Sequence, residues 1–175
     1  MTGSFVFLER SLKSLDRFEL QEIFCTHIIE APLWQLCKQG NLAKVREAIA
    51  RGEDVNSKNE GKWTALMLAI FERDTEIVKH LLDQPTVDLN CTNINGQTAL
   101  HVAAWKDNVE ALKMLLVDPR LTTHNHKNNY DWTPAMMAAH WKKAGALREL
   151  VAHPSVDLDT KDSFGRSLEE VARWS

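Results

Sequence analysis

One sequence pattern returns along this chain at a nearly constant interval. A segment that starts a helix, with a hydroxyl residue before small and apolar residues, begins at Thr64, Thr98 and Thr133, and a degenerate copy begins at Ser167. Successive starts lie 34, 35 and 34 residues apart (98−64, 133−98 and 167−133). A fixed period in this range is typical of stacked repeats, in which each unit contacts only its neighbours. The spacing therefore predicts a solenoid rather than a domain with one central core.

The residues at the start of each copy also favour a helix N-terminus. The hydroxyl of Thr64, Thr98 or Thr133 can accept a hydrogen bond from the first helical turn. Pro134 suits the first helical position, because the N–H that proline lacks has no helical partner there. We expect two helices per unit, joined by a tight turn and followed by a projecting loop that ends on Gly or Asp. The expected helices include 31–37, 42–50, 65–72, 75–83 and a final short helix at 167–173.

The predicted fold class is an all-α repeat solenoid of helix-turn-helix units joined by β-turn or hairpin loops, with an N-terminal helical extension. The repeat domain is expected at 31–175, and its units are 31–60, 61–95, 96–130, 131–164 and a half-repeat at 165–175. Residues 1–30 stand outside the period, and their apolar spacing predicts a helix at about 11–29. This extension either caps the exposed end of the first unit or recruits a partner, and the sequence leaves both open.

Composition narrows the class of protein. The 175 residues are 44% hydrophobic and 26% charged, as in ordinary globular proteins, and the net charge is −3. No basic stripe points to nucleic acid, and no run approaches the roughly 20 apolar residues of a membrane span. Cys25, Cys37 and Cys91 are odd in number and lack metal-ligand spacing, which favours reduced thiols. We expect a cytoplasmic protein, with a nuclear location also compatible, and no membrane or nucleic-acid partner.

The repeat carries a recognisable motif in the segment from Gly96 to Ala104, which reads Gly-Gln-Thr-Ala-Leu-His-Val-Ala-Ala. In the preceding unit, residues 76–82 read Glu-Ile-Val-Lys-His-Leu-Leu. Together these segments resemble the ankyrin-repeat family, and the resemblance covers residues 31–175 as four repeats plus a C-terminal half-repeat. It implies the solenoid fold and a role in binding other proteins, but it names no partner, because a fold does not dictate a function.

The turns between paired helices depart from the family pattern. The family's Gly-His turn is represented by Gly40-Asn41 in the first unit, but by Arg73-Asp74, Asp107-Asn108 and Lys142-Lys143 in the next three. A turn residue with positive φ costs about 1 kcal/mol more when it is not glycine. We therefore expect strained or loosened turns at these three positions.

The sequence lacks the motifs of an enzyme. It has no Gly-rich phosphate loop, no G-x-S-x-G and no H-E-x-x-H. His124 and His126 form the one close histidine pair, and we expect them on a loop surface rather than in a metal site, since further ligands at a plausible spacing are missing. His101 is expected to make a structural hydrogen bond between helix and loop. The prediction is a protein that is not an enzyme and has no cofactor or metal.

Aromatic residues mark the candidate binding surface. In the resembled family, the variable positions just after the two alanines line a concave groove. The predicted protein-binding residues are the aromatic and charged residues at those positions and near the loop tips, namely Phe71, Glu72, Trp105, Lys106, His140, Trp141, Trp63, Tyr130 and Trp132. The alternative is that some of them only pack together, with Trp105 stacking on Trp141. Trp34 and Trp174 are expected in the core of the terminal units.

Two asparagines are candidate modification sites. The resemblance implies that Asn56 and Asn90, which end the Asp-Val-Asn and Asp-Leu-Asn segments, can be hydroxylated in this family. The alternative is that each side chain bonds the backbone within its own turn.

The expected function is that of a non-catalytic module, expected to be a monomer, which binds a partner protein through the concave groove and the loop tips. Phe71, Trp105 and Trp141 would be the anchors, and Glu72 and Lys106 would set the register. Two alternatives stay open on analogy with the family: a regulatory inhibitor of an enzyme such as a kinase, and a recruiting subunit of a ubiquitin ligase.

Overall fold

The computed structural model describes residues 31–174, which form nine helices. The described helices belong to the unit Pro32–Ser175. The extension predicted at 1–30, with its helix at 11–29, lies outside the described residues. The helices are α3 (Leu33–Lys38), α4 (Leu42–Ala50), α5 (Ala65–Glu72), α6 (Thr75–Leu82), α7 (Ala99–Lys106), α8 (Val109–Leu116), α9 (Pro134–His140), α10 (Ala144–Ala152) and α11 (Leu168–Trp174). None of these helices is long and apolar enough to cross a membrane.

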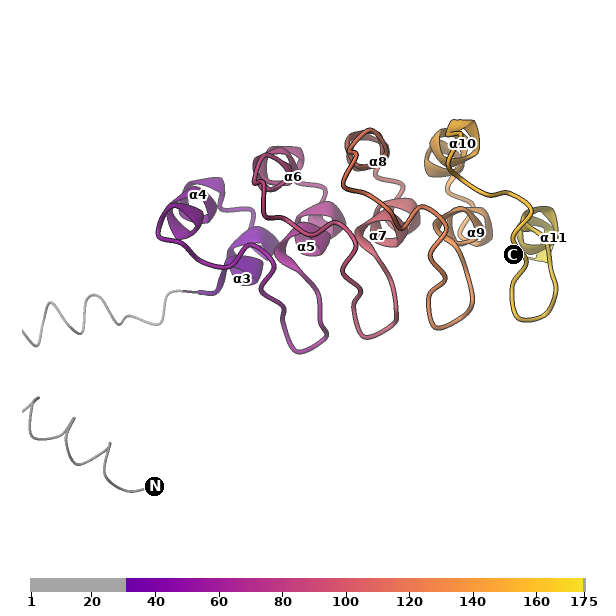
Figure 1. Cartoon of the computed structure of the whole chain (residues 1–175), viewed down its shortest axis with the longest axis horizontal. Helices are drawn as coiled ribbons and strands as arrows, with labels where there is room; N and C mark the ends of the chain where they lie inside the picture. Colours follow the sequence, from indigo (N-terminus) through magenta and orange to yellow (C-terminus); the bar gives the residue numbers. More distant parts are fainter. Residues whose placement is uncertain (1–30, 175) are drawn as a thin grey trace, which may run out of the picture. The chain divides into compact units, whose positions relative to one another are not determined.

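The helices form two layers, with a row of loops along one side (Figure 1). The inner layer consists of α3, α5, α7, α9 and α11, and each of these helices packs against the next in that order. The outer layer consists of α4, α6, α8 and α10, which also contact one another in sequence. This arrangement confirms the predicted all-α stack of paired helices. The buried core is a seam between neighbouring units, filled by side chains such as Leu66, Leu100, Met136 and Leu150.

The threonines start the inner helices as predicted. The side chains of Thr64, Thr98 and Thr133 are the N-caps of α5, α7 and α9, and each accepts a hydrogen bond from the backbone N–H three residues later. In α7 the side chain of His101 also accepts from the backbone N–H of Thr98, which completes a reciprocal capping box. The regular return of this cap explains why the units begin at the predicted period.

The turns between paired helices adopt the left-handed conformation without opening. Positive φ occurs at Arg73 (62°), Asp107 (53°) and Lys142 (52°), as the missing glycines predict. Of the expected strain or loosening, the strain is found, since these non-glycine residues hold positive φ, but the turns are not loosened, because their hydrogen bonds are kept. In the last of them, the Lys142 N–H donates to Ala139 at 3.1 Å and the Lys143 N–H donates to Ala138 at 2.8 Å. This is the usual pattern of a helix that ends on a left-handed residue.

The residue after each left-handed position begins the outer helix. Asp74 and Asn108 accept hydrogen bonds from the first turns of α6 and α8 through their side chains. Lys143 has no such side chain, and the Oδ1 atom of Asp107 in the preceding unit accepts from the Ala146 N–H at 2.6 Å instead. The cap of α10 is therefore supplied by its neighbour, which couples the two units.

The projecting loops are organised by one side chain each. The Oδ1 atom at the start of each loop accepts one or two backbone N–H groups from the same loop, at Asn59, Asn93, Asn128 and Asp162. Positive φ falls on Gly96, Asp131 and Gly165, as predicted for the residue that closes the loop. In the first loop it falls on Lys62 rather than Gly61. Asn and Asp therefore act here mainly as hydrogen-bond acceptors.

The prediction of a core position is wrong for Trp174. This side chain is 69% exposed, and the guanidinium of Arg166 lies over its ring at 4.5 Å from the centroid. The buried residue of α11 is Val171, on the side that packs against α9. Trp174 has a free face because no further described helix stacks on α11. Trp34 in α3 is half-buried.

Candidate binding site: an aromatic cavity

Two aromatic clusters lie where the loops meet the ends of the inner helices. In the first, the Trp63 ring meets the Phe71 ring edge-on at 5.6 Å between centroids, and Phe71 lies 5.6 Å from Trp105. Trp63 comes from a loop, whereas Phe71 and Trp105 come from the last turns of α5 and α7. This cluster therefore joins two successive units.

The second cluster belongs to the next unit. Its rings follow one another at 6.2 Å from Tyr130 to Trp132, 4.5 Å from Trp132 to His140, and 5.2 Å from His140 to Trp141. Tyr130 is 64% exposed and Trp141 is 50% exposed, whereas Trp132 and His140 are half-buried. Trp174 extends the cluster, with its ring 6.5 Å from that of His140. The free indole and phenol surfaces give this cluster an exposed apolar edge.

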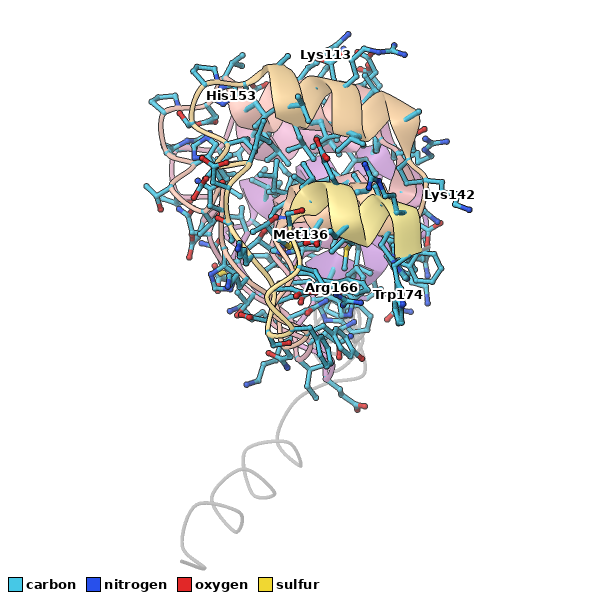
Figure 2. All side chains as sticks on the ribbon, turned by 90° about the vertical axis from the view of Figure 1, so that its right-hand side faces the viewer. Lys113, Met136, Lys142, His153, Arg166 and Trp174 are labelled. Carbon is cyan, nitrogen blue, oxygen red and sulfur yellow. The ribbon has the colours of Figure 1, made fainter. Side chains whose placement is uncertain are left out.

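A hollow of about 380 Å³ lies between the two clusters. We call it the aromatic cavity, and it is lined by Trp63, Asn95, Gln97, Trp105, Tyr130, Trp132, Met137, His140 and Trp141. Its volume falls within the range of small-ligand and side-chain pockets. Figure 2 shows Lys142 and Trp174 on one side of the unit, away from His153 on the other.

One buried histidine positions a wall of this cavity. The Nδ1 atom of His101 accepts from the Thr98 N–H at 3.2 Å, and its Nε2–H donates to the Trp132 carbonyl at 2.9 Å. Burial lowers the pKa of His101 to about 4, against the smaller opposing effect of the hydrogen bond to Trp132. The ring is therefore neutral near pH 7 and ties α7 to the loop that carries Trp132. This confirms the predicted bond between helix and loop.

His140, inside the second cluster, is also held neutral. Burial lowers its pKa, and the positive charge of Arg166 lowers it further. Its buried Nδ1 atom has no hydrogen-bond partner, which a protonated ring would make costly. Among the described residues that line the aromatic cavity, none is then charged near pH 7.

Two cationic side chains near the clusters lie over aromatic rings. The ammonium of Lys106 lies 3.9 Å from the Phe71 centroid and 6.0 Å from that of Trp105. Arg166 forms an ion pair with Asp162 at 2.6 Å while it covers the Trp174 ring. Both arrangements are cation–π contacts, in which a positive charge lies against the electron-rich ring face.

The structure brings most of the predicted site residues together. Six of the nine line the aromatic cavity: Trp63, Trp105, Tyr130, Trp132, His140 and Trp141. Phe71 and Glu72 line a neighbouring hollow of about 230 Å³, and Lys106 packs over Phe71. Within residues 31–174, the stacking of Trp105 on Trp141 is not found, because Trp105 contacts Phe71 and Trp141 contacts His140.

Three lining residues were missed by sequence reasoning: Asn95, Gln97 and Met137. Gln97 is buried beneath the loop, where its side chain accepts from the Asn93 amide at 2.9 Å and donates to the Met137 sulfur at 4.0 Å. A search for exposed aromatic residues does not find such positions. The one sequence signal for Gln97 is its position directly before the capping threonine Thr98, a position that recurs in each unit.

The asparagines proposed for modification connect successive units. The Asn56 amide donates to the Thr86 carbonyl at 2.8 Å and accepts from the Asp88 N–H at 2.8 Å. Asn90 makes the same pair of bonds to Arg120 and Thr122, both at 2.9 Å. The expectation of bonding within one turn is therefore wrong, since each side chain reaches the next loop. Hydroxylation of Asn56 and Asn90 stays a prediction.

The remaining candidates for a chemical role are His124, His126 and Cys37. His124 stacks on His153 at 5.3 Å between centroids, and His126 meets His101 edge-on at 6.1 Å. Across the described part of the chain, no group of three or more histidine, cysteine or carboxylate side chains could hold a metal ion. Burial raises the pKa of the Cys37 thiol to about 12. This thiol stays protonated and does not act as a nucleophile at neutral pH.

Stacked helix pairs with projecting loops define a repeat solenoid as the class. The chain belongs to the ankyrin-repeat family: the model described as "Ankyrin repeats", in 3 copies, matches residues 33–125, which is more than half of the chain. Ankyrin repeats are generally protein–protein interaction modules.

The chain is similar to segments of larger proteins. It is 34% identical over 157 residues to the inactive serine/threonine-protein kinase TEX14 of Bos taurus, covering 83% of this chain and 10% of that protein. It is 32% identical over 85 residues to transient receptor potential cation channel subfamily A member 1 of Homo sapiens, covering 49% and 8%. Identity is 40% over 79 residues to protein phosphatase 1 regulatory subunit 12A of Mus musculus, covering 45% and 7%. The chain thus spans a tenth or less of each of these relatives.

Proposed function

We propose that the protein binds a partner protein through the aromatic cavity and the loop tips beside it. The observation that carries this proposal is the exposed indole of Trp141, half open to solvent at the edge of a hollow that also holds Trp105 and Trp132. Tryptophans at the centre of a pocket dominate the binding energy of many interfaces. When a partner covers a half-exposed aromatic edge of this kind, apolar surface is removed from water, and the free energy of binding becomes more favourable.

The predicted binding residues contribute to the interface in different ways. Trp141 and Tyr130 have the most surface left to bury and serve as anchors. Phe71 is already covered by Lys106, so this pair supports Trp105 and contributes less direct contact. Glu72 is exposed beside Phe71 and sets the register through its charge, which affects specificity and association rate more than affinity.

The test is affinity purification with mass spectrometry on the full chain and on Trp141→Ala and Trp105→Ala. The matched control is Val151→Ala, which removes an exposed apolar side chain from the outer helix α10. We expect partners recovered by the full chain and by the control to fall at least fivefold with Trp141→Ala. Equal recovery from all variants, with helical circular dichroism intact, would contradict the proposal.

The same experiment separates the two alternative functions. A kinase among the lost partners would point to a regulatory inhibitor, and a subunit of a ubiquitin ligase would point to a recruiting role. Comparison with a chain that lacks residues 1–30 assigns any partner that depends on this extension.

A further inference from the structure

We infer that the aromatic cavity binds the trimethylammonium group of a trimethylated lysine side chain in the partner protein. This inference rests on the proposed function and gives the chemistry of the group that enters the cavity. Its starting point is the lining, which brings Trp63, Trp105, Tyr130, Trp132 and Trp141 around one hollow. Cations that lie against several such rings are bound by cation–π attraction, and quaternary ammonium groups are the ligands best suited to it.

The protein's own cations show that this surface attracts positive charge. Lys106 lies over Phe71 at one end of the aromatic region, and Arg166 lies over Trp174 at the other. Between these two occupied places, the aromatic cavity holds no lysine or arginine of the described chain. Of the lining rings, Trp105 has the Lys106 ammonium at 6.0 Å from its centroid. The rings of Trp63, Trp132 and Trp141 also line the hollow, which fits a cation supplied by another molecule.

The polar groups of the cavity favour a methylated cation over a plain ammonium. Lysine's ammonium has three N–H donors and is strongly hydrated, so it needs acceptors to replace its lost water. None of the described lining residues is a carboxylate, and the amide oxygen of Gln97 already accepts from Asn93. The acceptors that remain are neutral groups, such as the Asn95 amide, and they attract an ammonium less strongly than a carboxylate does. A trimethylammonium group has no N–H donor and leaves none unsatisfied. The same reasoning disfavours arginine, which has five donors.

The charges around the aromatic cavity do not repel a bound cation strongly. Arg166, the charge that acts on His140, is neutralised by its ion pair with Asp162 at 2.6 Å. His140 is itself neutral near pH 7 because it is partly buried beside Trp132. Glu72 and Lys38 both line the neighbouring hollow beside Phe71, so their opposite charges add no net positive charge there. The cavity volume of about 380 Å³ leaves room for the ammonium head and part of its stem.

The test uses three small probes with the full chain: Nα-acetyl-trimethyllysine methylamide, its unmethylated counterpart, and the isostere in which a tert-butyl carbon replaces the charged nitrogen. Binding is followed by the indole N–H signals of the six tryptophans in nitrogen–proton correlation spectra. Trp34 lines neither the aromatic cavity nor the neighbouring hollow and serves as the internal control. We expect the signals of the four lining tryptophans to shift with the trimethylated probe, and that of Trp34 to stay in place.

The comparison between the probes separates the effect of the positive charge on affinity from the effect of shape. We expect the trimethylated probe to bind about tenfold more tightly than the neutral isostere, as cation–π attraction requires, and more tightly than plain lysine. Trp141→Ala should abolish the shifts, whereas the control Val151→Ala, which removes an exposed apolar side chain of the outer helix α10, should keep them. Equal binding of the trimethylated and tert-butyl probes would overturn the inference while leaving an apolar partner site in place. Absence of shifts with every probe would also overturn it, and the affinity purification then decides the proposed function separately.

Discussion

At the scale of single residues, His101 connects the fold to the site. Its ring is fully buried, caps α7 through Thr98 and holds the Trp132 carbonyl on the wall of the aromatic cavity. Both bonds need a neutral ring, because Nδ1 accepts a hydrogen bond and Nε2 donates one. Protonation would place a second proton on Nδ1, opposite the N–H of Thr98. Protonation of the His101 ring is therefore coupled to unfolding.

We predict that stability falls as the pH is lowered from about 6.5 to about 4. The pKa of His101 is 6.5 in an unfolded chain and about 4 in the fold, so in this interval the unfolded state takes up the proton first. The stabilisation is fully present above pH 6.5, and the loss reaches about 3 kcal/mol near pH 4. His124 and His140, whose pKa values are also lowered, add to it in the same direction.

Urea unfolding at pH 7 and pH 4.5 measures this effect for the protein and for His101→Gln. The glutamine cannot titrate in this range, so the variant should lose less free energy of unfolding between the two pH values, although it starts from a lower value. An identical pH dependence in both proteins would show that His101 is not the group responsible.

Single residues also show where sequence reasoning stops. Trp105, His140 and Trp141 follow from the repeat register, and Trp63, Tyr130 and Trp132 from the loop tips. These six of the nine predicted residues line the aromatic cavity, and their role in binding stays a prediction. Gln97 and Met137 could not be predicted, because they enter its lining through packing between two units. Trp174 is expected in the core of the terminal unit, yet it is exposed because no further described helix stacks on α11.

At the scale of elements, local chemistry determined most boundaries. The helices expected at 42–50 and 65–72 coincide with α4 and α5, because side-chain caps and the apolar period act within one unit. Features that need a neighbour could not be predicted. Gly145 in α10 is an example: a Cβ atom there would lie 2.8 Å from a methyl of Val109 and 2.9 Å from Asp107. The close approach of α10 explains both this glycine and the cap that Asp107 supplies.

The turns between paired helices provide a test of stored strain. Lys142 holds φ at 52° with an exposed side chain, and its backbone hydrogen bonds are intact. We predict that Lys142→Gly raises the free energy of unfolding by about 0.5–1 kcal/mol, because glycine adopts this conformation without the cost that a Cβ atom brings. Thermal or urea unfolding measures the change.

Lys142→Ala is the control for loss of the lysine side chain. Alanine keeps the Cβ atom and therefore the strain, so this variant should stay close to the original protein in stability. If alanine stabilised the protein as much as glycine does, the effect would come from the removed charge, and strain at Lys142 would be excluded as its cause.

At the scale of the whole repeat domain, the stack has no single core. Inner helices contact the next inner helix, and outer helices contact the next outer helix, so each unit is stabilised by its two interfaces. Asparagine bridges such as Asn56 to Thr86 and Asn90 to Arg120 repeat this coupling along the loops. The aromatic cavity spans three successive loops, and its shape therefore depends on the relative placement of units rather than on any one of them.

This organisation predicts that damage to one unit stays local. Leu150 in α10 is fully buried, and Leu150→Ala should cost about 2–5 kcal/mol through lost burial and the cavity left behind. Because α10 contacts α7, α8 and α9 but not the first units, amide hydrogen exchange should speed up in residues 134–174 and change little in residues 33–72. Mass spectrometry of peptides after exchange measures both regions in one sample. Leu66→Ala, a matched change in α5, should reverse the pattern, whereas equal acceleration along the whole stack in both variants would mean that it unfolds as one cooperative block.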